Sequence, residues 1–437
     1  MDLKNLTKQQ KILFGVVGII VIFAILVILG IIPGLRKNSN IGPGGSSTPE
    51  ATLEFWGIDK REVFSSLIDA YQNTAGIKIN YTQINPNTYE EDLIDALASQ
   101  RGPDVLMINH NWLRKHYEKL YPIPSGTLSI EDLKNNIFVE TVAKDMVLQN
   151  KIWGLPLWMD TLALYYNKDI FNNASIALPP ATWQEFQNIS RSLTEKSITG
   201  EIQRAGAAIG TSANIDDSAD ILALLMLQTC STIADATGKA IFNDDLGKQA
   251  VSFYTSFANP ASLYYSWNNN MPESVSAFSQ GKVAMIFGYN SLRAEIEKKN
   301  PYLNYGIANM PQSFKQCYPG EPDKPYRNYA DYWVLAVSAT SKNPIPAWNL
   351  IFHLVDSEQA KQYLTATGKA PASRVLISAM QKDEKIGVFV KQASTAKSWV
   401  QNDPEKNTAV FKNMIESIVR GYLSLDNALT QSAELIR

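Results

Sequence analysis

An uncharged apolar run near the amino terminus constrains this chain more than any other feature. From Ile12 to Ile32 the sequence passes through 21 residues without a charged side chain. About 20 residues in a helix, each rising 1.5 Å, are enough to cross the hydrocarbon layer of a bilayer. A cleaved signal peptide is the competing interpretation, but its apolar stretch is usually shorter and ends at a small-residue site. We therefore predict an uncleaved transmembrane anchor over residues 12–32.

The flanks of this run predict its orientation and the character of the next segment. Three lysines precede the run, and Arg36 and Lys37 come after it, a slight basic excess on the amino side that favours a cytoplasmic segment 1–11. No cysteine stands near the end of the run, so a lipid anchor is not predicted there. Residues 33–50 are rich in Gly, Ser and Pro and predict a flexible linker. We expect a single-pass protein of the cell membrane, with a body over 51–437 that is extracellular or periplasmic.

Composition excludes several classes of function. The formal net charge of the 437-residue chain is −2, which gives no reason to expect a nucleic-acid partner. The histidines form no metal-ligand pattern, and His353 sits in an apolar helical stretch, so we predict neither a metal nor a cofactor. Cys230 and Cys317 form no framework of spaced cysteines. Pairing of the two remains open at this point, and we favour two unpaired thiols.

The start of the body alternates between strand and helix patterns. Alternating apolar residues over 52–56 and 77–81 predict strands, and apolar residues at helical spacing over 63–71 and 93–97 predict the helices between them. Residues 104–108 form a short apolar run of the kind found in buried parallel strands. The order strand, helix, strand, helix, strand predicts an α/β body with an open parallel sheet.

The carboxyl ends of these strands carry polar and aromatic side chains. Trp56-Gly57-Ile58-Asp59 comes after the first strand, and Asn109-His110-Asn111-Trp112 comes after the third. Ligands of open α/β sheets bind beyond the carboxyl ends of the strands. Mixed aromatic and polar linings are typical of small-molecule sites, so we expect one at this edge.

Several sequence blocks farther along carry a resemblance to a known family. Residues 154–169 read GLPLWMDTLALYYNKD, and residues 179–186 read PPATWQEF, in which Thr182 and Glu185 form a predicted helix capping box. Residues 277–288 read AFSQGKVAMIFG, and residues 347–372 begin with Ala-Trp and end with TGKAPA. In this order the blocks resemble those of the family 1 extracellular solute-binding proteins, the maltose-binding-protein-like subunits of ABC importers. The likeness extends over roughly residues 51–430.

The resemblance implies a fold and a mechanism. It implies a two-lobed, periplasmic-binding-protein-like α/β fold of type II, with lobe 1 at about 51–157 and 309–356 and lobe 2 at about 159–307 and 358–437. The lobes would close on a solute by hinge motion, and the closed form would be presented to ABC permease subunits. We expect a monomer that binds a sugar or oligosaccharide and is not an enzyme.

A sugar-binding cleft needs flat aromatic surfaces beside carboxylate, amide or guanidinium groups. Asp160 is the strongest polar candidate, because the resemblance places a carboxylate beside the crossing between lobes. Our candidate ligand-binding residues are Trp56, Asn109, Asn111, Trp112, Trp158, Asp160, Tyr264, Trp267, Tyr289, Asn290, Asp331, Tyr332, Trp333, Arg374 and Trp399.

Ordinary packing competes with ligand contact at several of these positions. Trp112 also suits a helix start, Trp333 precedes an apolar strand, and Arg374 suits a solvated surface. Trp183 and Trp348 are left out, because the first begins a capped helix and the second lies in an apolar helical stripe.

Other functions remain open from the sequence. A tethered glycoside hydrolase would need two carboxylates flanking the scissile bond, and Asp160 with Asp331 is the pair to consider. No nucleophile elbow, Walker loop or HExxH motif supports catalysis. A peptide or polyamine as the solute, and a signalling receptor in place of a permease, also remain open.

Overall fold

The computed structural model describes residues 51–323 and 325–436. The predicted anchor at 12–32 and linker at 33–50 lie outside these residues. Ala51–Arg437 clusters as one compact unit by contacts between Cα atoms. Within the described residues, none of the helices combines the length and the apolar character needed to span a bilayer.

The first half of this unit is built on a sheet with the strand order β2-β1-β3-β15-β4, and β7 also pairs with β15. The strands are β1 (Thr52–Gly57), β2 (Lys78–Gln83), β3 (Val105–Asn109), β4 (Leu120–Tyr121), β7 (Leu155–Pro156) and β15 (Trp333–Ser338). The pairs β1–β2 and β1–β3 are parallel, so the predicted strand and helix alternation is confirmed. All residues of β3 are buried, as its continuous apolar sequence predicts.

Helices pack on this sheet and beside it. They are α2 (Arg61–Ala75), α3 (Tyr89–Ala98), α4 (Leu113–His116), α5 (Ile130–Asp132), α6 (Glu140–Met146), α13 (Pro344–Val355), α14 (Ser357–Thr367) and α15 (Arg374–Met380). The short ribbon β5 (Val147–Leu148) and β6 (Lys151–Ile152) comes after α6. Helix α13 contacts β15 and β3, and α14 contacts α2 and α13. The lobe boundaries given above stay a prediction.

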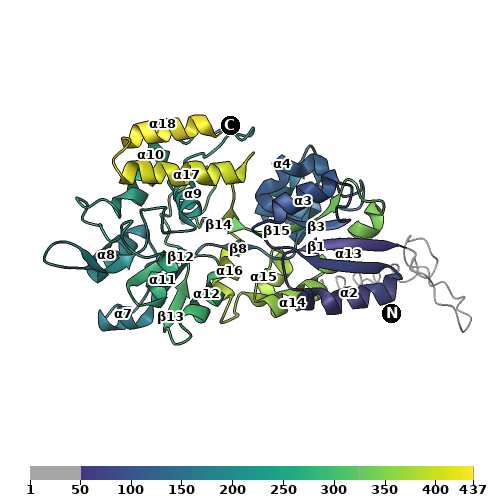
Figure 1. Cartoon of the computed structure of the whole chain (residues 1–437), viewed down its shortest axis with the longest axis horizontal. Coiled ribbons are helices and arrows are strands. Elements are labelled where there is room, and N and C mark those ends of the chain that lie inside the picture. Colours follow the sequence, from purple (N-terminus) through teal and green to yellow (C-terminus); the bar gives the residue numbers. More distant parts are fainter. Residues whose placement is uncertain (1–50, 324, 437) are drawn as a thin grey trace, which may run out of the picture. The chain divides into compact units, whose positions relative to one another are not determined.

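The second half has its own sheet, in the order β10-β11-β12-β9-β13. Its strands are β9 (Ala163–Asn167), β10 (Glu195–Lys196), β11 (Ile202–Ala207), β12 (Val283–Gly288) and β13 (Tyr305–Ala308). Its helices are α7 (Lys168–Asn173), α8 (Trp183–Leu193), α9 (Ser218–Thr229), α10 (Asp245–Ser256), α11 (Ser274–Ser279), α12 (Leu292–Lys299), α17 (Pro404–Val419) and α18 (Leu425–Leu435). Figure 1 shows the two sheets in different parts of the unit, each with its own helices.

A small third sheet lies between the two large ones (Figure 1). It has the order β16-β14-β8, with β8 (Asp160–Thr161), β14 (Asn328–Asp331) and β16 (Ala396–Lys397). Helix α16 (Gly387–Ala393) contacts both β8 and β14. Strand β8 connects β7 of the first sheet to β9 of the second, and β14 leads into β15 of the first. This sheet therefore holds the chain crossings between the two halves.

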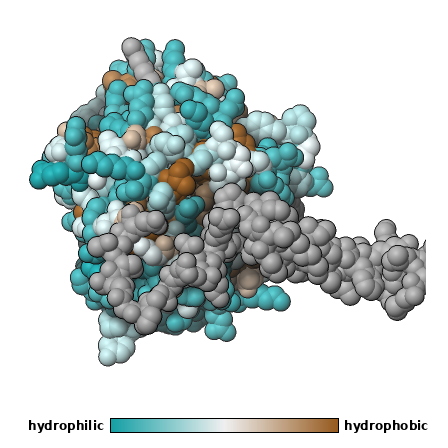
Figure 2. Space-filling model, turned by 90° about the vertical axis from the view of Figure 1, so that its right-hand side faces the viewer, coloured by the Kyte–Doolittle hydropathy of each residue, from teal (hydrophilic) through white to brown (hydrophobic). Residues whose placement is uncertain are grey.

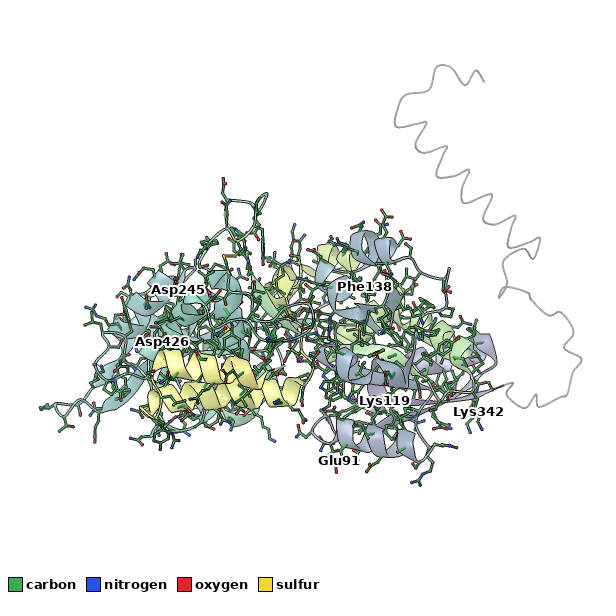
Figure 3. The ribbon with its side chains drawn as sticks, turned by 90° about the horizontal axis from the view of Figure 1, so that it is seen from above. Glu91, Lys119, Phe138, Asp245, Lys342 and Asp426 are labelled. Carbon is green, nitrogen blue, oxygen red and sulfur yellow. A yellow bond between two sulfur atoms is a disulfide. The ribbon has the colours of Figure 1, made fainter. Side chains whose placement is uncertain are left out.

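The cores follow from the sequence patterns. Helix α9 is apolar on nearly all sides and is buried against α10 and α17. Helix α17 also packs along α18, and Lys248 of α10 forms an ion pair of 2.5 Å with Asp426 of α18. In Figure 3, Asp245 and Asp426 accordingly lie on neighbouring elements. Trp183 and Trp348 are 7% and 1% exposed, as their omission from the site predicted.

The predicted capping box at the start of α8 is confirmed. Thr182 accepts the backbone N–H of Glu185, and the Glu185 carboxylate accepts the N–H of Thr182. Both free N–H groups are thereby satisfied at the point where the helix begins.

The prediction that the two cysteines stay unpaired is wrong. Cys230 and Cys317 form a disulfide across 87 residues of sequence. Cys230 ends α9 in the left-handed conformation, and Gln228 of the same helix donates hydrogen bonds to the carbonyls of Pro311 and Arg327. The loop after β13 therefore lies on the end of α9. This tertiary contact could not be predicted from the spacing of the two cysteines.

The face of the molecule turned to the viewer in Figure 2 is largely hydrophilic where it is coloured, and its hydrophobic residues form small separate spots. Scattered apolar residues of this kind are normal on a folded surface. The coloured part of this face therefore gives no sign of a binding surface, in contrast to the region between the two large sheets.

Candidate functional site

Two aspartates face each other on the third sheet. In the antiparallel pairing of β14 with β8, Asp331 lies directly opposite Asp160. Like charges at directly opposed positions destabilise a pair of strands. Asp160 is 9% exposed, so little water is available to screen its charge. The pair is therefore an unusual feature to find at the crossing between two halves.

Backbone donors hold Asp160 in place. The N–H of Asn290, just after β12, donates to both carboxylate oxygens of Asp160 at 3.1 and 3.0 Å. The N–H of Thr161 donates to Oδ1 at 2.9 Å. Burial raises the pKa of Asp160 to about 7, the two N–H donors work against that rise, and the charge of Asp331 adds to it. The site thus contains a carboxyl group that holds its proton up to neutral pH.

The first turn of α9 brings two further carboxylates to the same place. Asp220 accepts the hydroxyl of Tyr289 at 2.8 Å, and its pKa is raised to about 6 by burial and by the charge of Asp331. Asp217 lies at the end of β12, where a methyl group added at Gly288 would be 3.4 Å from its Oδ2. Burial, and then the charge of Asp220, raise the pKa of Asp217 well above its usual value. We call Asp160, Asp217, Asp220 and Asp331 the acidic network.

The end of β3 closes the network on the side of the first half. The amide Nδ2 of Asn109 donates to Oδ1 of Asp331 at 2.7 Å, and Nε2 of His110 lies 3.9 Å from the same oxygen. The other ring nitrogen of His110 pairs with Asp145 at 3.0 Å. Burial lowers the pKa of His110, but the hydrogen bond and charge of Asp145 outweigh that effect and raise it. The main polar partner of His110 is therefore Asp145, and Asp331 is a more distant one.

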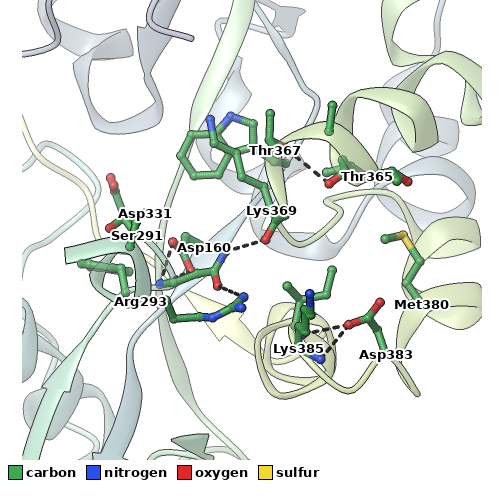
Figure 4. Close-up of a pocket in the computed structure, with 18 of the residues that line it drawn as sticks. Asp160, Ser291, Arg293, Asp331, Thr365, Thr367, Lys369, Met380, Asp383 and Lys385 are labelled. Carbon is green, nitrogen blue, oxygen red and sulfur yellow. Dashed lines mark hydrogen bonds between the residues drawn. The ribbon is translucent and has the colours of Figure 1, made fainter. Parts of the chain in front are cut away.

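A cavity of about 540 Å³ opens on this network, and we call it the crossing cavity. Its lining includes Trp158, Asp160, Tyr289, Asn290 and Asp331. In Figure 4, Asp160 and Asp331 lie on one side of the cavity, and Met380 and Asp383 lie on the other. Both halves contribute to it, since Asn290 comes after a strand of the second sheet and donates from Nδ2 to the carbonyl of Gly368 at the end of α14.

One wall of the crossing cavity is an aromatic ring supported by a lysine. Nζ of Lys369 lies 4.3 Å from the centre of the Trp158 ring, a cation–π arrangement. The same ammonium pairs with Asp59 at 2.6 Å, and Asp59 also accepts the hydroxyl of Tyr363. Burial lowers the pKa of Lys369, and the charge of Asp59 opposes that shift. Lys369 is thus a structural partner of Asp59 and Trp158.

A second hollow of about 420 Å³ lies between the end of β3 and α17, and we call it the α17 groove. Its lining includes Asn109, Asn111, Trp112, Glu405 and Lys412. Asn109 connects this groove to the crossing cavity through its hydrogen bond to Asp331. The two hollows therefore form neighbouring parts of one polar region between the halves.

The structure brings eight of the fifteen candidate residues to these two hollows. The crossing cavity takes Trp158, Asp160, Tyr289, Asn290 and Asp331, and the α17 groove takes Asn109, Asn111 and Trp112. Trp399 lines a small pocket beside Asn111, where its ring stacks on Phe411. The neighbouring positions of these residues support the use of strand ends as a guide to the site.

The structure places the other candidates elsewhere. Trp267 is fully buried and donates to Asn214, and Tyr332 is fully buried and donates to Asp145, so neither side chain reaches solvent. Trp333 is 9% exposed and packs against Trp112 and Tyr89.

The last three candidates do not line the two hollows either. Trp56 is half-buried against the core of the first half. Tyr264 lines a separate surface hollow with Phe253 and Leu425. Arg374 is exposed, and its guanidinium donates to the carbonyl of Lys134.

Sequence reasoning missed Asp217, Asp220 and His110. The first two stand in the segment Asp216-Asp217-Ser218-Ala219-Asp220 just before an apolar helix, which is an available signal for carboxylates at a helix start. Among the residues the structure describes, no group of three or more His, Cys, Asp or Glu side chains is arranged to hold a metal ion.

Comparison with known proteins agrees with this architecture. A maltose-binding protein of Listeria monocytogenes, in complex with maltose, superposes with a TM-score of 0.71 at 19% identity, covering 89% of this chain and 97% of the other. A maltooligosaccharide ABC transporter solute-binding lipoprotein of Streptococcus pneumoniae is 23% identical over 422 residues, 90% of this chain and 89% of the relative. A putative binding protein of Brucella abortus is 23% identical over 370 residues, 84% of each chain.

The structural likeness shows a two-lobed α/β fold. The sequence model of the bacterial extracellular solute-binding proteins matches residues 57–370. The chain belongs to this family, and the resemblance to family 1 solute-binding proteins inferred from its sequence blocks is confirmed.

Proposed function

We propose that this protein captures a sugar or oligosaccharide outside the cytoplasmic membrane and presents it to the permease subunits of an ABC importer. The observation that carries the proposal is the crossing cavity, in which Trp158 stands beside Asp160, Asn290 and Asp331 between the two halves. A sugar has apolar C–H faces and a rim of hydroxyls, and a ring beside carboxylate and amide groups matches both. The maltose complex and the maltooligosaccharide-binding relative support the same class of solute.

Closure of the halves is the proposed binding step. Residues from both halves line the crossing cavity, so a solute held there gains contacts only when the halves are together. The crossings of the third sheet are the segments that would absorb the motion. The closed form is the one that the permease would recognise. The predicted monomeric state remains part of this proposal.

We further propose that residues 12–32 anchor the protein in the membrane, with the body on the outer side. The apolar run supports the anchor, and the disulfide between Cys230 and Cys317 supports the location, because disulfides persist in oxidising compartments. The test is membrane fractionation of cells that express the full chain or a chain lacking 12–32. The anchored form is expected in the membrane pellet and the shortened form in the soluble fraction. Recovery of both in the soluble fraction would contradict the anchor.

The solute is tested by thermal shift of the purified full-length chain against mono- and oligosaccharides. A solute that binds the folded state alone raises the melting temperature. We expect at least one sugar to do so, and we expect Trp158→Ala and Asp160→Ala each to abolish its effect. Asp69→Ala, at an exposed position of α2, serves as the matched control and should keep the full shift.

Folding of each variant is checked by circular dichroism and by its own melting temperature, because Trp158 is 6% exposed and packs in the protein. If both variants fold and keep an unchanged shift, the solute does not bind at the crossing cavity. If every sugar leaves the parent unchanged while a peptide or polyamine raises its melting temperature, the carbohydrate assignment fails.

A further inference from the structure

We propose that His110 and Asp145 are positioning residues of the solute site. Asp145 holds the ring of His110 by one nitrogen. A proton on the other nitrogen then keeps Asp331 as the charged member of its opposed pair with Asp160. This inference rests on the proposed function, because Asp160 and Asp331 line the crossing cavity. Among the described residues, the lining of that cavity does not include His110 or Asp145, so both act on a solute through Asp331.

Asp145, at the end of α6, accepts hydrogen bonds from three separate segments. The hydroxyl of Tyr332, between β14 and β15, donates to Oδ2 at 2.7 Å, and Nδ1 of His110, after β3, lies 3.0 Å from the same oxygen. The hydroxyl of Ser398, after β16, donates to Oδ1. An ionised carboxyl group only accepts hydrogen bonds, so the hydrogen of the contact with His110 is on Nδ1.

Stacking fixes the ring of His110 as well. The side chain is 3% exposed, and its ring stacks on that of Tyr332 with the centres 4.3 Å apart and the planes 7° apart. Tyr332 is fully buried and is tied to the same Asp145. Turning the imidazole would break its contact with Asp145, so Nε2 stays on the side of Asp331, where it lies 3.9 Å from Oδ1.

This place of Nε2 calls for a proton. A bare ring nitrogen carries a lone pair, and here it would face an oxygen of Asp331 with little water nearby, which is repulsive. A protonated nitrogen makes the ring a cation between Asp145 and Asp331. Burial lowers the pKa of His110, and the hydrogen bond and charge of Asp145 raise it. The charges of Asp331 and Asp220 act in the same direction as Asp145, so the net shift of this pKa is upward.

Two basic side chains beside the ring oppose this proton. Arg114 and Lys144 line a small pocket together with His110 and Asp145. Lys144 is exposed and Arg114 is half-buried, and the Arg114 guanidinium donates to the carbonyl of Ala236. Water screens charges at such positions more than it screens a buried pair. The contact between His110 and Asp145 therefore prevails.

The charged ring acts on one member of the opposed pair. Asp331 faces Nε2 of His110 and accepts the amide N–H of Asn109 at 2.7 Å. Asp160 is buried instead, and chiefly for that reason its pKa is raised to about 7. Below pH 7 the pair therefore keeps its proton on Asp160 and its charge on Asp331. Directly opposed like charges are thereby avoided, and Asp331 is left as an acceptor for a hydroxyl of the solute.

The first test is an NMR titration of the histidine rings in the full-length chain without solute. The sequence has three histidines, and burial lowers the pKa of both His116 and His353. We expect one ring to titrate above the ordinary value of 6.5, and we expect His110→Gln to remove its signal. Asp145→Asn should lower this midpoint by about one pH unit or more, because the ring loses its nearest opposite charge.

The second test is calorimetric titration at pH 6 and pH 8.5 with a sugar that raises the melting temperature. As the pH rises, the ring loses its proton and Asp160 becomes charged, so the affinity of the parent should fall. His110→Gln should weaken binding about tenfold at pH 6 and less than about threefold at pH 8.5, because the parent ring is neutral at the higher pH. Asp145→Asn should show the same pattern. His353→Gln, in α13, is the matched control and should bind as the parent does at both pH values.

A purely structural role predicts a different pattern, in which the loss of affinity is equal at both pH values. That result in variants that fold by circular dichroism would overturn the inference and leave the proposed function in place. So would a His110 ring that titrates below 6.5 in the free parent, a measurement that needs no variant to fold. If no sugar binds, the proposed function fails on its own, because the titration of the free protein still supports or overturns the place of the proton.

Discussion

Asp160 combines burial, two backbone donors and an opposed carboxylate. Its selection from the sequence depended on the family resemblance of the block GLPLWMDTLALYYNKD, which places a carboxylate beside the crossing between lobes. Its opposed partner Asp331 was also a candidate. The two face each other only because β8 pairs with β14, and the two residues are 171 positions apart in the sequence. No local pattern contains such a register.

The pKa of Asp160 leads to a prediction on stability. Its value rises from 3.8 to about 7 on folding, so the folded protein binds the proton more tightly than the unfolded chain does. Stability from this group is therefore present at low pH and is lost as the pH rises through the window between these values. We expect the parent to lose more stability than Asp160→Asn between pH 5 and pH 8.

The measurement is urea unfolding of both proteins at a series of pH values. The quantity followed is the difference between their free energies of unfolding. Asp331, Asp217 and Lys369 also face Asp160, but they are present in both proteins. Asp220, with a pKa of about 6, titrates in the same range, but it is present in both proteins and cancels in the difference. A difference that does not change with pH would contradict the raised pKa of Asp160.

Lys369 supports a prediction about positioning. Its ammonium connects Asp59 to the Trp158 ring, so Lys369→Met should release the ring and leave the half-buried Asp59 without its cation. We expect the affinity for the preferred sugar to fall by about tenfold. We also expect the wavelength of maximum tryptophan emission to differ from that of the parent. Lys361→Met, on an exposed position of α14, is the control and should change neither quantity.

At the scale of elements, the local signals predicted structure well where they act within one turn. The capping box at the start of α8 is an example, since Thr182 and Glu185 are three residues apart and need no distant partner. Thr182→Ala should lower the free energy of unfolding by about 1 kcal/mol. Gln184→Ala, exposed on the same turn, should change it by less than about 0.5 kcal/mol. Equal effects of both substitutions in chemical denaturation would contradict the role of the cap.

The disulfide is an element that local signals could not predict. It closes a loop of 87 residues, and its formation depends on the loop after β13 reaching the end of α9. Replacing Cys230 and Cys317 with alanine should lower the free energy of unfolding by about 2 to 4 kcal/mol, because the unfolded chain is no longer constrained.

Reductant provides the control for this prediction. It should lower the melting temperature of the parent and leave the doubly substituted protein unchanged, because only the parent has a bond to reduce. Alkylation of both thiols in the untreated folded parent, detected by mass spectrometry, would show that the bond does not form.

At the scale of the whole molecule, the fold class was predictable and the complete site was not. The order of strands and helices and the family blocks led to a two-lobed α/β protein, which the match over residues 57–370 supports. Five of the predicted residues meet in the crossing cavity because strand ends from both sheets converge there. Trp267 and Tyr332 do not line this cavity. Their rings are buried in the core, where the polar group of each has a hydrogen-bond partner.

The central claim is that a carbohydrate binds between the two halves at the third sheet. Hydrogen exchange of the full-length chain, followed by mass spectrometry with and without a saturating sugar, tests it directly on the backbone. The account predicts slower exchange in peptides that cover 105–112, 156–164, 286–294 and 328–334, where the cavity-lining segments lie. Unchanged exchange in all four segments, with protection elsewhere in the chain, would contradict the account.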